Sequence, residues 1–166
     1  MKQKFKRIIL HWTAGANRPN AIDKKAYHYL IDDRGVVHKG VHNPEANLDC
    51  SDGVYAAHTG GGNTGSIGVA LCGMAQFSYP RISTPFPLTK LQLEAAFSFL
   101  AKLCKRYGLS PDEEVLMTHF EFGQKNPTTT SKGKIDIVYM HPYPTVHKYE
   151  VGNFIRGKVK WYLQQL

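Results

Sequence analysis

The stretch RIILHW at residues 7–12 decides how the N-terminal part of this chain folds. Its three consecutive aliphatic residues lead into His11 and Trp12, and a short apolar run of this kind is typical of a buried β-strand. A second run, VLMT at residues 115–118, ends directly before His119. Each of these two histidines is therefore expected where a short buried strand meets a loop, a position from which an imidazole can point into a cleft.

Further strands are predicted from other short apolar runs. Residues 27–31 and 36–38 flank the turn sequence DDRG at 32–35, which favours a β-hairpin. In SIGVALC, residues 66–72, small residues alternate with Ile, Val and Leu. This pattern is expected of a strand with one face on the core and the other face closely approached by a neighbour.

Two helices are predicted as well. Thr89 and Gln92 fit a capping box at the start of residues 90–107, and Gly108 fits a helix end. A weaker helix is expected near residues 152–165. Segments rich in Gly, Thr, Asn and Pro are expected to form long loops, at 43–65 and 120–146. Strands mixed with helices predict an α/β or α+β fold, with a central mixed sheet flanked by helices and a cleft at the strand ends.

The composition describes an ordinary globular protein with an excess of positive charge. The 166 residues fit one domain spanning residues 1–166, and 42% of them are hydrophobic. The net charge of +8 indicates an anionic partner. Because the basic residues are scattered, we expect no nucleic-acid partner, although a basic metal-dependent nuclease is the alternative that this charge suggests. The three cysteines form no CxxC pair, which excludes a zinc ribbon or a redox dithiol.

Most of the eight histidines are expected to be ordinary. Those in polar turns and loops are expected to be solvated, namely His38, His42, His141 and His147. Alternation in residues 27–31 places Tyr27 and Tyr29 on one face of their strand. His28 shares the other face with Leu30, so we expect it to be packed and hydrogen-bonded and not to bind a metal.

His11 and His119 differ from the others because each follows a buried strand. In the segment KID, Lys134 and Asp136 are two residues apart and therefore face one side of an extended chain. Two imidazoles and one carboxylate make a three-ligand zinc site with an open fourth position. A lysine ammonium beside such a site can stabilise an oxyanion. These residues together predict a metal-dependent hydrolase.

Five short strings occur in the order in which one enzyme family has them. They are IILHWTA (8–14), YHYLI (27–31) with the turn DRG (33–35), AHTGG (57–61), NTGSIGVAL (63–71) and THF (118–120). Over residues 7–136 the chain thereby resembles the type 2 N-acetylmuramoyl-L-alanine amidases, a family that also includes the peptidoglycan recognition proteins and several phage endolysins.

The resemblance implies a zinc amidase that cleaves the amide between the lactyl group of N-acetylmuramic acid and L-alanine in peptidoglycan. It implies that His11, His119 and Asp136 bind one zinc ion. Lys134 matches a lysine that stabilises the transition state, and Tyr27 matches a tyrosine that assists catalysis in phage-type members.

The resemblance also points to substrate-binding residues. In the family, the neighbourhood of His58, Thr59 and Asn63 lines the substrate groove, and the glycines between them would let the backbone approach a ligand closely. A glycine-rich turn with solvated polar groups is the alternative. Trp12, directly after a predicted ligand, either stacks on a sugar or caps the core.

The chain departs from the family pattern at several positions. Ala70 stands where other branches carry a catalytic glutamate, which gives Tyr27 more weight. Residues 120–132 are unlike the short loop usual before the Lys-x-Asp segment, and Ile137 replaces the usual proline. Glu121 is the substitute carboxylate if Asp136 is not the third ligand.

Several biological roles are compatible with this chemistry. The basic charge and the lack of a signal-peptide segment fit an endolysin-like, bacteriolytic enzyme, made in the cytoplasm without a signal peptide and degrading the cell wall after release. The alternatives are a cytoplasmic muropeptide-recycling amidase, an injected toxin and a non-catalytic muropeptide-binding module. We expect a monomer that binds peptidoglycan or muropeptides and does not insert stably into membranes.

Overall fold

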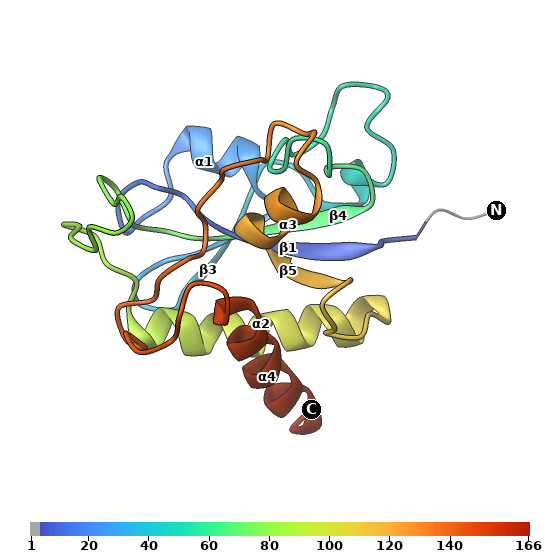
Figure 1. Ribbon diagram of the computed structural model, residues 1–166. Coiled ribbons are helices and arrows are strands. Elements are labelled where there is room, and N and C mark those ends of the chain that lie inside the picture. Colours follow the sequence, from blue (N-terminus) through green and yellow to red (C-terminus); the bar gives the residue numbers. More distant parts are fainter. Residues whose placement is uncertain (1–3) are drawn as a thin grey trace.

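The computed structural model describes residues 4–166, which form a five-stranded mixed sheet with the strand order β3-β2-β4-β1-β5 (Figure 1). At its centre, β1 (Arg7–Trp12) pairs in parallel with β4 (Ser66–Leu71) and with β5 (Leu116–Thr118). On the other side of β4 lies β2 (Tyr29–Ile31), also parallel, and β3 (Val37–Lys39) closes that edge in antiparallel orientation. The mixed central sheet that the sequence predicts is confirmed.

The burial of the strands follows their place in the sheet. All six residues of β4 are buried, as are Ile8, Ile9 and Leu10 in β1. Parallel strands covered on both faces require such nearly continuous apolar sequences. Val37 and Lys39 on the edge strand are exposed instead. The sequence thus places the apolar runs at the centre of the sheet and the polar hairpin at its edge.

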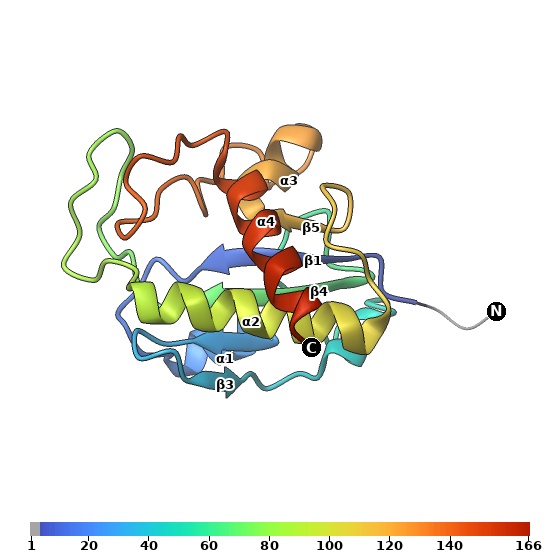
Figure 2. The same ribbon diagram turned by 90° about the horizontal axis from the view of Figure 1, so that it is seen from below.

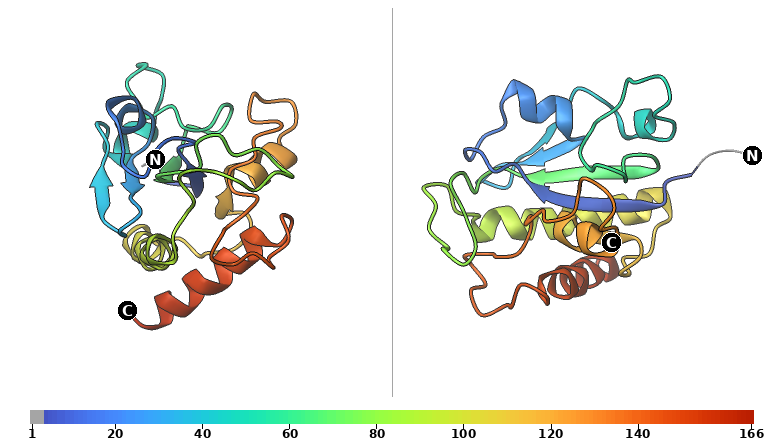
Figure 3. Two further views of the ribbon diagram at one scale, coloured as in Figure 1. Left: turned by 90° about the vertical axis from the view of Figure 1, so that its left-hand side faces the viewer. Right: turned by 45° about the horizontal axis from the view of Figure 1, so that its top comes forward.

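Helices cover both faces of the sheet (Figure 2, Figure 3). On one face lie α2 (Lys90–Tyr107) and α4 (Val151–Gln164), whose apolar side chains join those of β1 and β4 in the main core. On the other face lie the short helices α1 (Ala21–Ala26) and α3 (His119–Lys125). The carboxyl end of β1 leads into a loop, and the carboxyl end of β5 leads directly into α3.

The predicted long helix has the predicted ends. The Thr89 side chain accepts a hydrogen bond from the Gln92 backbone N–H, and the Gln92 side chain accepts one from the Thr89 backbone N–H. Gly108 ends the helix in the left-handed conformation, at φ 66°, which glycine adopts without steric cost. The helix expected near 152–165 is also present, as α4.

Three local expectations are wrong. The predicted loop 120–146 contains most of α3, and the predicted loop 43–65 contains a short 3₁₀ helix, η1 (Pro44–Asn47). Tyr27 does not share a strand face with Tyr29, because β2 begins only at Tyr29 and Tyr27 is the C-terminal cap of α1. Tyr27 packs instead against the cluster containing Leu30, on the opposite face of the sheet from Tyr29.

Within residues 4–166, none of the helices has the length and apolarity that crossing a bilayer requires.

Candidate metal centre

Three buried side chains from distant parts of the chain converge at the carboxyl end of the sheet. His11 Nδ1 lies 3.1 Å from His119 Nδ1 and 3.1 Å from Asp136 Oδ2. His119 Nδ1 lies 3.2 Å from the same Asp136 oxygen. Two imidazole nitrogens and one carboxylate oxygen are a donor set that zinc prefers.

The elements of the fold bring these side chains together. β1 carries His11 beside Ala70 of β4, and the neighbouring strand β5 ends at Thr118, directly before His119. Thr118 caps α3 through a hydrogen bond from the Glu121 N–H, which fixes the start of the helix at His119. The loop that follows α3 returns to it, because the Phe120 N–H donates to the Asp136 carbonyl at 2.6 Å.

The outer nitrogen of each imidazole has its own partner. His119 Nε2 lies 2.9 Å from Ser131 Oγ, and the Ser131 hydroxyl donates to the Gly60 carbonyl at 2.8 Å. Since a hydroxyl carries one proton, His119 Nε2 must be the donor to Ser131. His119 Nδ1 then has no proton and presents its lone pair to the cluster.

The same reasoning applies to His11. His58 Nε2 faces the Ser66 carbonyl at 3.3 Å and must donate to it, so His58 Nδ1 is an acceptor. His11 Nε2 lies 3.1 Å from that acceptor and 3.3 Å from Thr59 Oγ1, and it donates to them. His11 Nδ1 is therefore unprotonated as well.

The electrostatics favour a cation in the middle of this cluster. Burial lowers the pKa of His11 below its ordinary value and lowers that of His58 well below it, so both imidazoles are neutral. Burial by itself would raise the pKa of Asp136, but its close contacts with the two imidazoles outweigh burial and lower this pKa below its ordinary value, so the carboxyl is ionised. Two lone pairs and one anionic oxygen therefore face one another at about 3 Å, and a metal ion fits this arrangement.

A cleft of about 440 Å³ opens beside the cluster. Its lining includes His119 and Asp136 together with four other residues singled out in the sequence, Trp12, Tyr27, His58 and Lys134. The ring centre of Tyr27 lies 5.1 Å from that of His11. Burial, with a smaller contribution from the charge of Asp136, raises the pKa of Tyr27, so its phenol stays protonated as a hydrogen-bond donor. Lys134 is exposed and borders the open side of the cleft.

Of the three residues predicted to bind substrate in the glycine-rich segment, His58 lines the cleft. Thr59 is fully buried, and Asn63 Oδ1 accepts a hydrogen bond from the Thr59 N–H at 2.8 Å, so neither lines the cleft. His58 is 6% exposed, and its ring lies against His11 and forms part of the cleft wall. The glycines here do not leave room for a ligand, because Cβ atoms built at Gly60 and Gly62 would overlap the side chains of Thr130 and Phe122.

The structure also shows where Trp12 and Glu121 lie relative to the metal cluster and the cleft. Trp12 is 5% exposed and packs edge-on against Phe77, so it belongs mainly to the core while one side borders the cleft. Glu121 is not near the cluster, because both of its carboxylate oxygens accept hydrogen bonds from Arg156 at 2.9 Å. Asp136 is thus the carboxylate that the fold brings to the two imidazoles.

His28 behaves as the sequence suggests. It is 1% exposed, its Nε2 lies 2.8 Å from Asn47 Oδ1, and its Nδ1 accepts a hydrogen bond from the Gly68 N–H at 2.9 Å. Both ring nitrogens are occupied, so His28 supports the neighbouring strand.

Ser131, by contrast, has no signal in the sequence that would link it to His119, because its position depends on the path of an irregular loop.

Comparisons with known proteins agree with this geometry. Residues 1–142 match the family described as "N-acetylmuramoyl-L-alanine amidase". Among curated proteins no sequence matches the chain. Among solved structures, Staphylococcus aureus hydrolase AmiA is 15% identical at a TM-score of 0.58, with coverage of 98% of this chain and 75% of that one.

Two further solved structures share the fold. A mutant of PlyL is 21% identical at a TM-score of 0.52, with coverage of 95% of this chain and 86% of that one. The Ph2119 endolysin from a Thermus scotoductus bacteriophage is 18% identical at a TM-score of 0.51, with coverage of 81% and 82%. At these identities the likeness describes the fold.

Proposed function

Because this chain belongs to the N-acetylmuramoyl-L-alanine amidase family, we propose that it is a zinc-dependent amidase that hydrolyses the bond between N-acetylmuramic acid and L-alanine in peptidoglycan. The observation that carries this proposal is the convergence of three proton-free ligand atoms within 3.2 Å of one another, beside an open cleft. The whole chain from residue 1 to 166 would serve as a single zinc amidase domain.

His11, His119 and Asp136 would hold the metal ion. When bound, zinc supplies Lewis-acid polarisation and lowers the pKa of water to about 7. The three protein ligands leave the cleft side of the site open for substrate. Trp12 forms part of the wall that orients the substrate there.

Lys134 and Tyr27 would act on the reacting amide. The Lys134 ammonium borders the cleft next to Asp136, where it can stabilise the oxyanion of the tetrahedral intermediate. The buried Tyr27 phenol stays protonated and donates a hydrogen bond to the attacking water or the oxyanion. Ala70 is fully buried and has no carboxylate, so this chain relies on Tyr27 and Lys134 where a glutamate-dependent mechanism is unavailable.

For the biological role we propose endolysin-like, bacteriolytic degradation of the cell wall. The net charge of +8 supports an anionic wall polymer as the substrate. In this proposal the protein is made in the cytoplasm, acts on the wall after release, works as a monomer, and needs neither nucleic acid nor membrane insertion. The alternative role is recycling of soluble muropeptides.

The chemistry is tested by incubating the purified protein with intact sacculi. We expect free N-terminal alanine to appear without new reducing sugar ends, to stop after chelation and to return with zinc. Preference for sacculi over soluble anhydro-muropeptides supports lysis, and the opposite preference supports recycling.

A muropeptide-binding module without catalysis is the rival function. It predicts a protein that binds stoichiometric zinc and muropeptide yet leaves the amide intact. That result would overturn the proposed activity. The presence of Tyr27 and Lys134 at the cleft, in addition to the three metal-binding side chains, favours the enzyme.

A further inference from the structure

Two segments far apart in the sequence lie against each other beside the metal cluster. They are the glycine-rich residues 58–62 and the irregular residues 126–131. A Cβ at Gly60 would overlap the Thr130 side chain, and one at Gly61 would overlap that of Thr129. The absence of side chains at these glycines therefore serves close contact between two parts of the chain itself.

This contact brings a hydroxyl to the outer side of one metal-binding imidazole. Ser131 is fully buried, and its oxygen accepts a hydrogen bond from His119 Nε2 at 2.9 Å. Its own proton goes to the Gly60 carbonyl at 2.8 Å. Ser131 thus connects His119 to the glycine-rich segment and leaves it with one possible tautomer.

The adjacent residues of the same segment hold the other imidazole. Thr59 Oγ1 lies 3.3 Å from His11 Nε2 and 2.7 Å from His58 Nδ1. The ring of His58 packs so closely on β4 that a Cβ at Gly68 would overlap it. His11 and His119 therefore share one rigid support made of consecutive residues, 58–60.

We propose that Ser131 is a positioning residue of the metal site, and that residues 58–60 and 129–131 form one clasp that orients both imidazoles. The inference rests on the proposed zinc function and adds residues to it. Groups that bind the outer nitrogen of a metal-binding histidine fix its tautomer and ring orientation, and their loss costs about 10- to 100-fold in metal affinity. In this proposal, the function of the unusual loop after α3 is to position His119 through Ser131.

The test measures zinc affinity of the full-length protein by competition with a chromophoric chelator. Ser131→Ala is compared with Thr128→Ala, which removes an exposed hydroxyl from the same loop. We expect the zinc Kd to rise about 10- to 100-fold in the first variant and to stay unchanged in the second. An unchanged zinc affinity in a folded Ser131→Ala variant overturns the inference.

A second variant tests the clasp from the side of the other imidazole. Thr59→Val keeps the shape of the buried side chain and removes its hydroxyl. We expect this variant to weaken zinc binding as well, and the double variant with Ser131→Ala to lose less than the product of the two single effects, because each change loosens the same segment. Multiplicative losses would mean two independent supports and would overturn the shared clasp.

The outcome is separable from that of the proposed function. Zinc affinity is measured without substrate, so it can fall in the variants whether or not the wild-type protein cleaves peptidoglycan. If the wild-type protein binds no zinc, the proposed function fails. If it binds zinc and hydrolyses the amide while Ser131→Ala and Thr59→Val keep full affinity, only the clasp fails. Thermal unfolding of the zinc-free variants distinguishes a folding defect from weakened metal binding.

Discussion

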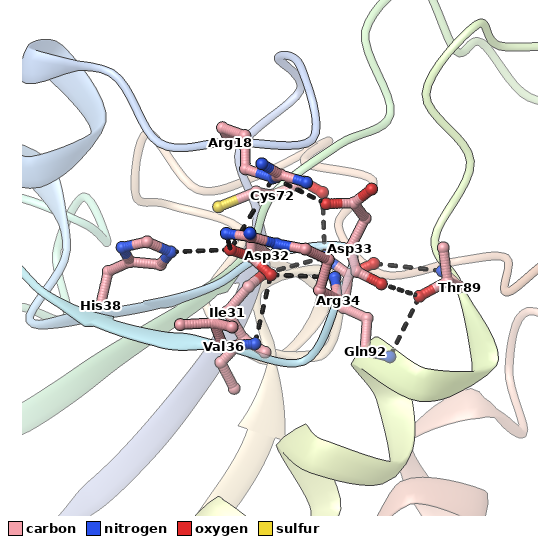
Figure 4. A network of polar contacts seen from close by, with 10 residues as sticks. All are labelled: Arg18, Ile31, Asp32, Asp33, Arg34, Val36, His38, Cys72, Thr89 and Gln92. Atoms are coloured by element: carbon pink, nitrogen blue, oxygen red, sulfur yellow. Dashed lines mark hydrogen bonds and ion pairs between the residues drawn. The ribbon is translucent and has the colours of Figure 1, made fainter.

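Two buried aspartates in this protein have opposite surroundings. Asp32, fully buried in the hairpin turn, accepts hydrogen bonds from the Arg34 guanidinium at 2.9 Å and from His38 at 2.8 Å (Figure 4). The backbone N–H groups of Arg34 and Val36 also donate to it. Asp136, which is 7% exposed, faces Nδ1 of His11 and Nδ1 of His119. Neither Nδ1 carries a proton, because the proton of each ring is on Nε2.

The difference in surroundings indicates which of the two carboxylates can bind a metal ion. Burial alone would raise the pKa of Asp32, but its hydrogen bonds with Arg34 and His38 reverse the effect and lower it well below the ordinary value. Asp32 is therefore a completed structural anchor. It also lies beside the start of α2, where the Thr89 hydroxyl donates to the Asp33 carbonyl at 2.6 Å. The Asp136 cluster has acceptors without protons, and that is the property of a metal site.

The strongest test of this contrast removes Asp136. We expect Asp136→Ala to weaken zinc binding by more than about 100-fold, beyond the effect of losing an outer-shell group, and to abolish amide hydrolysis. Zinc content after dialysis and the release of N-terminal alanine measure the two effects. Glu121→Gln is the matched control, since its carboxylate binds Arg156 and it should keep its zinc. Full metal and activity in Asp136→Ala would refute the ligand assignment.

The next test separates chemistry from metal binding. We expect Lys134→Ala to keep its zinc and to lose about 10²- to 10³-fold in kcat, the range for removing one donor to an oxyanion. Lys132→Ala removes a nearby exposed ammonium that does not line the cleft, and it should turn over normally. Equal losses in both variants would indicate a general effect of charge instead of a role in the transition state.

Much of the fold is predictable because local signals dominate there. The bounds of β1 follow from one apolar run, and those of α2 follow from its capping box and terminal glycine. The start of α3 carries the same kind of signal, a capping box between Thr118 and Glu121, but the segment has no apolar periodicity and reads as a loop. Helices this short depend on tertiary contacts more than on their own sequence.

The site is only partly predictable for a related reason. The ends of two strands place His11 and His119 at the carboxyl end of the sheet, and the family resemblance predicts roles for Asp136 and Lys134. The path of the irregular loop decides that Ser131 reaches His119 and that the glycine-rich segment is filled by the protein itself. Likewise the sequence predicts a solvated His38, but the hairpin register brings it to Asp32. Contacts of this kind depend on three-dimensional packing that no local pattern encodes.

The anchor role of Asp32 predicts a loss of stability without a loss of zinc. We expect Asp32→Asn to lower the free energy of unfolding by about 3 kcal/mol, the lower end for breaking a buried pair, because Arg34 and His38 stay accessible to water. Denaturant unfolding measures this, and zinc affinity should not change. Because the pKa of Asp32 is lowered in the folded protein, its contribution is complete above the ordinary carboxyl pKa of about 4 and is lost as the pH falls below it. A stability difference from wild type that does not shrink in acid would contradict the anchor.

The smallest expected effect concerns Tyr27. Its ring lies beside His11, but it takes no part in the hydrogen bonds that orient the metal-binding side chains. Tyr27→Phe removes one neutral hydrogen-bond donor, so we expect zinc affinity to stay unchanged and kcat to fall by about tenfold or less. Tyr29→Phe is the matched control, because Tyr29 lies on the opposite face of the sheet and packs edge-on against Phe99. Since burial raises the pKa of Tyr27, the phenol remains protonated, and the ratio of wild-type to variant kcat should be constant between about pH 6 and pH 9. A ratio that changes with pH in this interval would mean that Tyr27 exchanges a proton during the reaction instead of donating a fixed hydrogen bond.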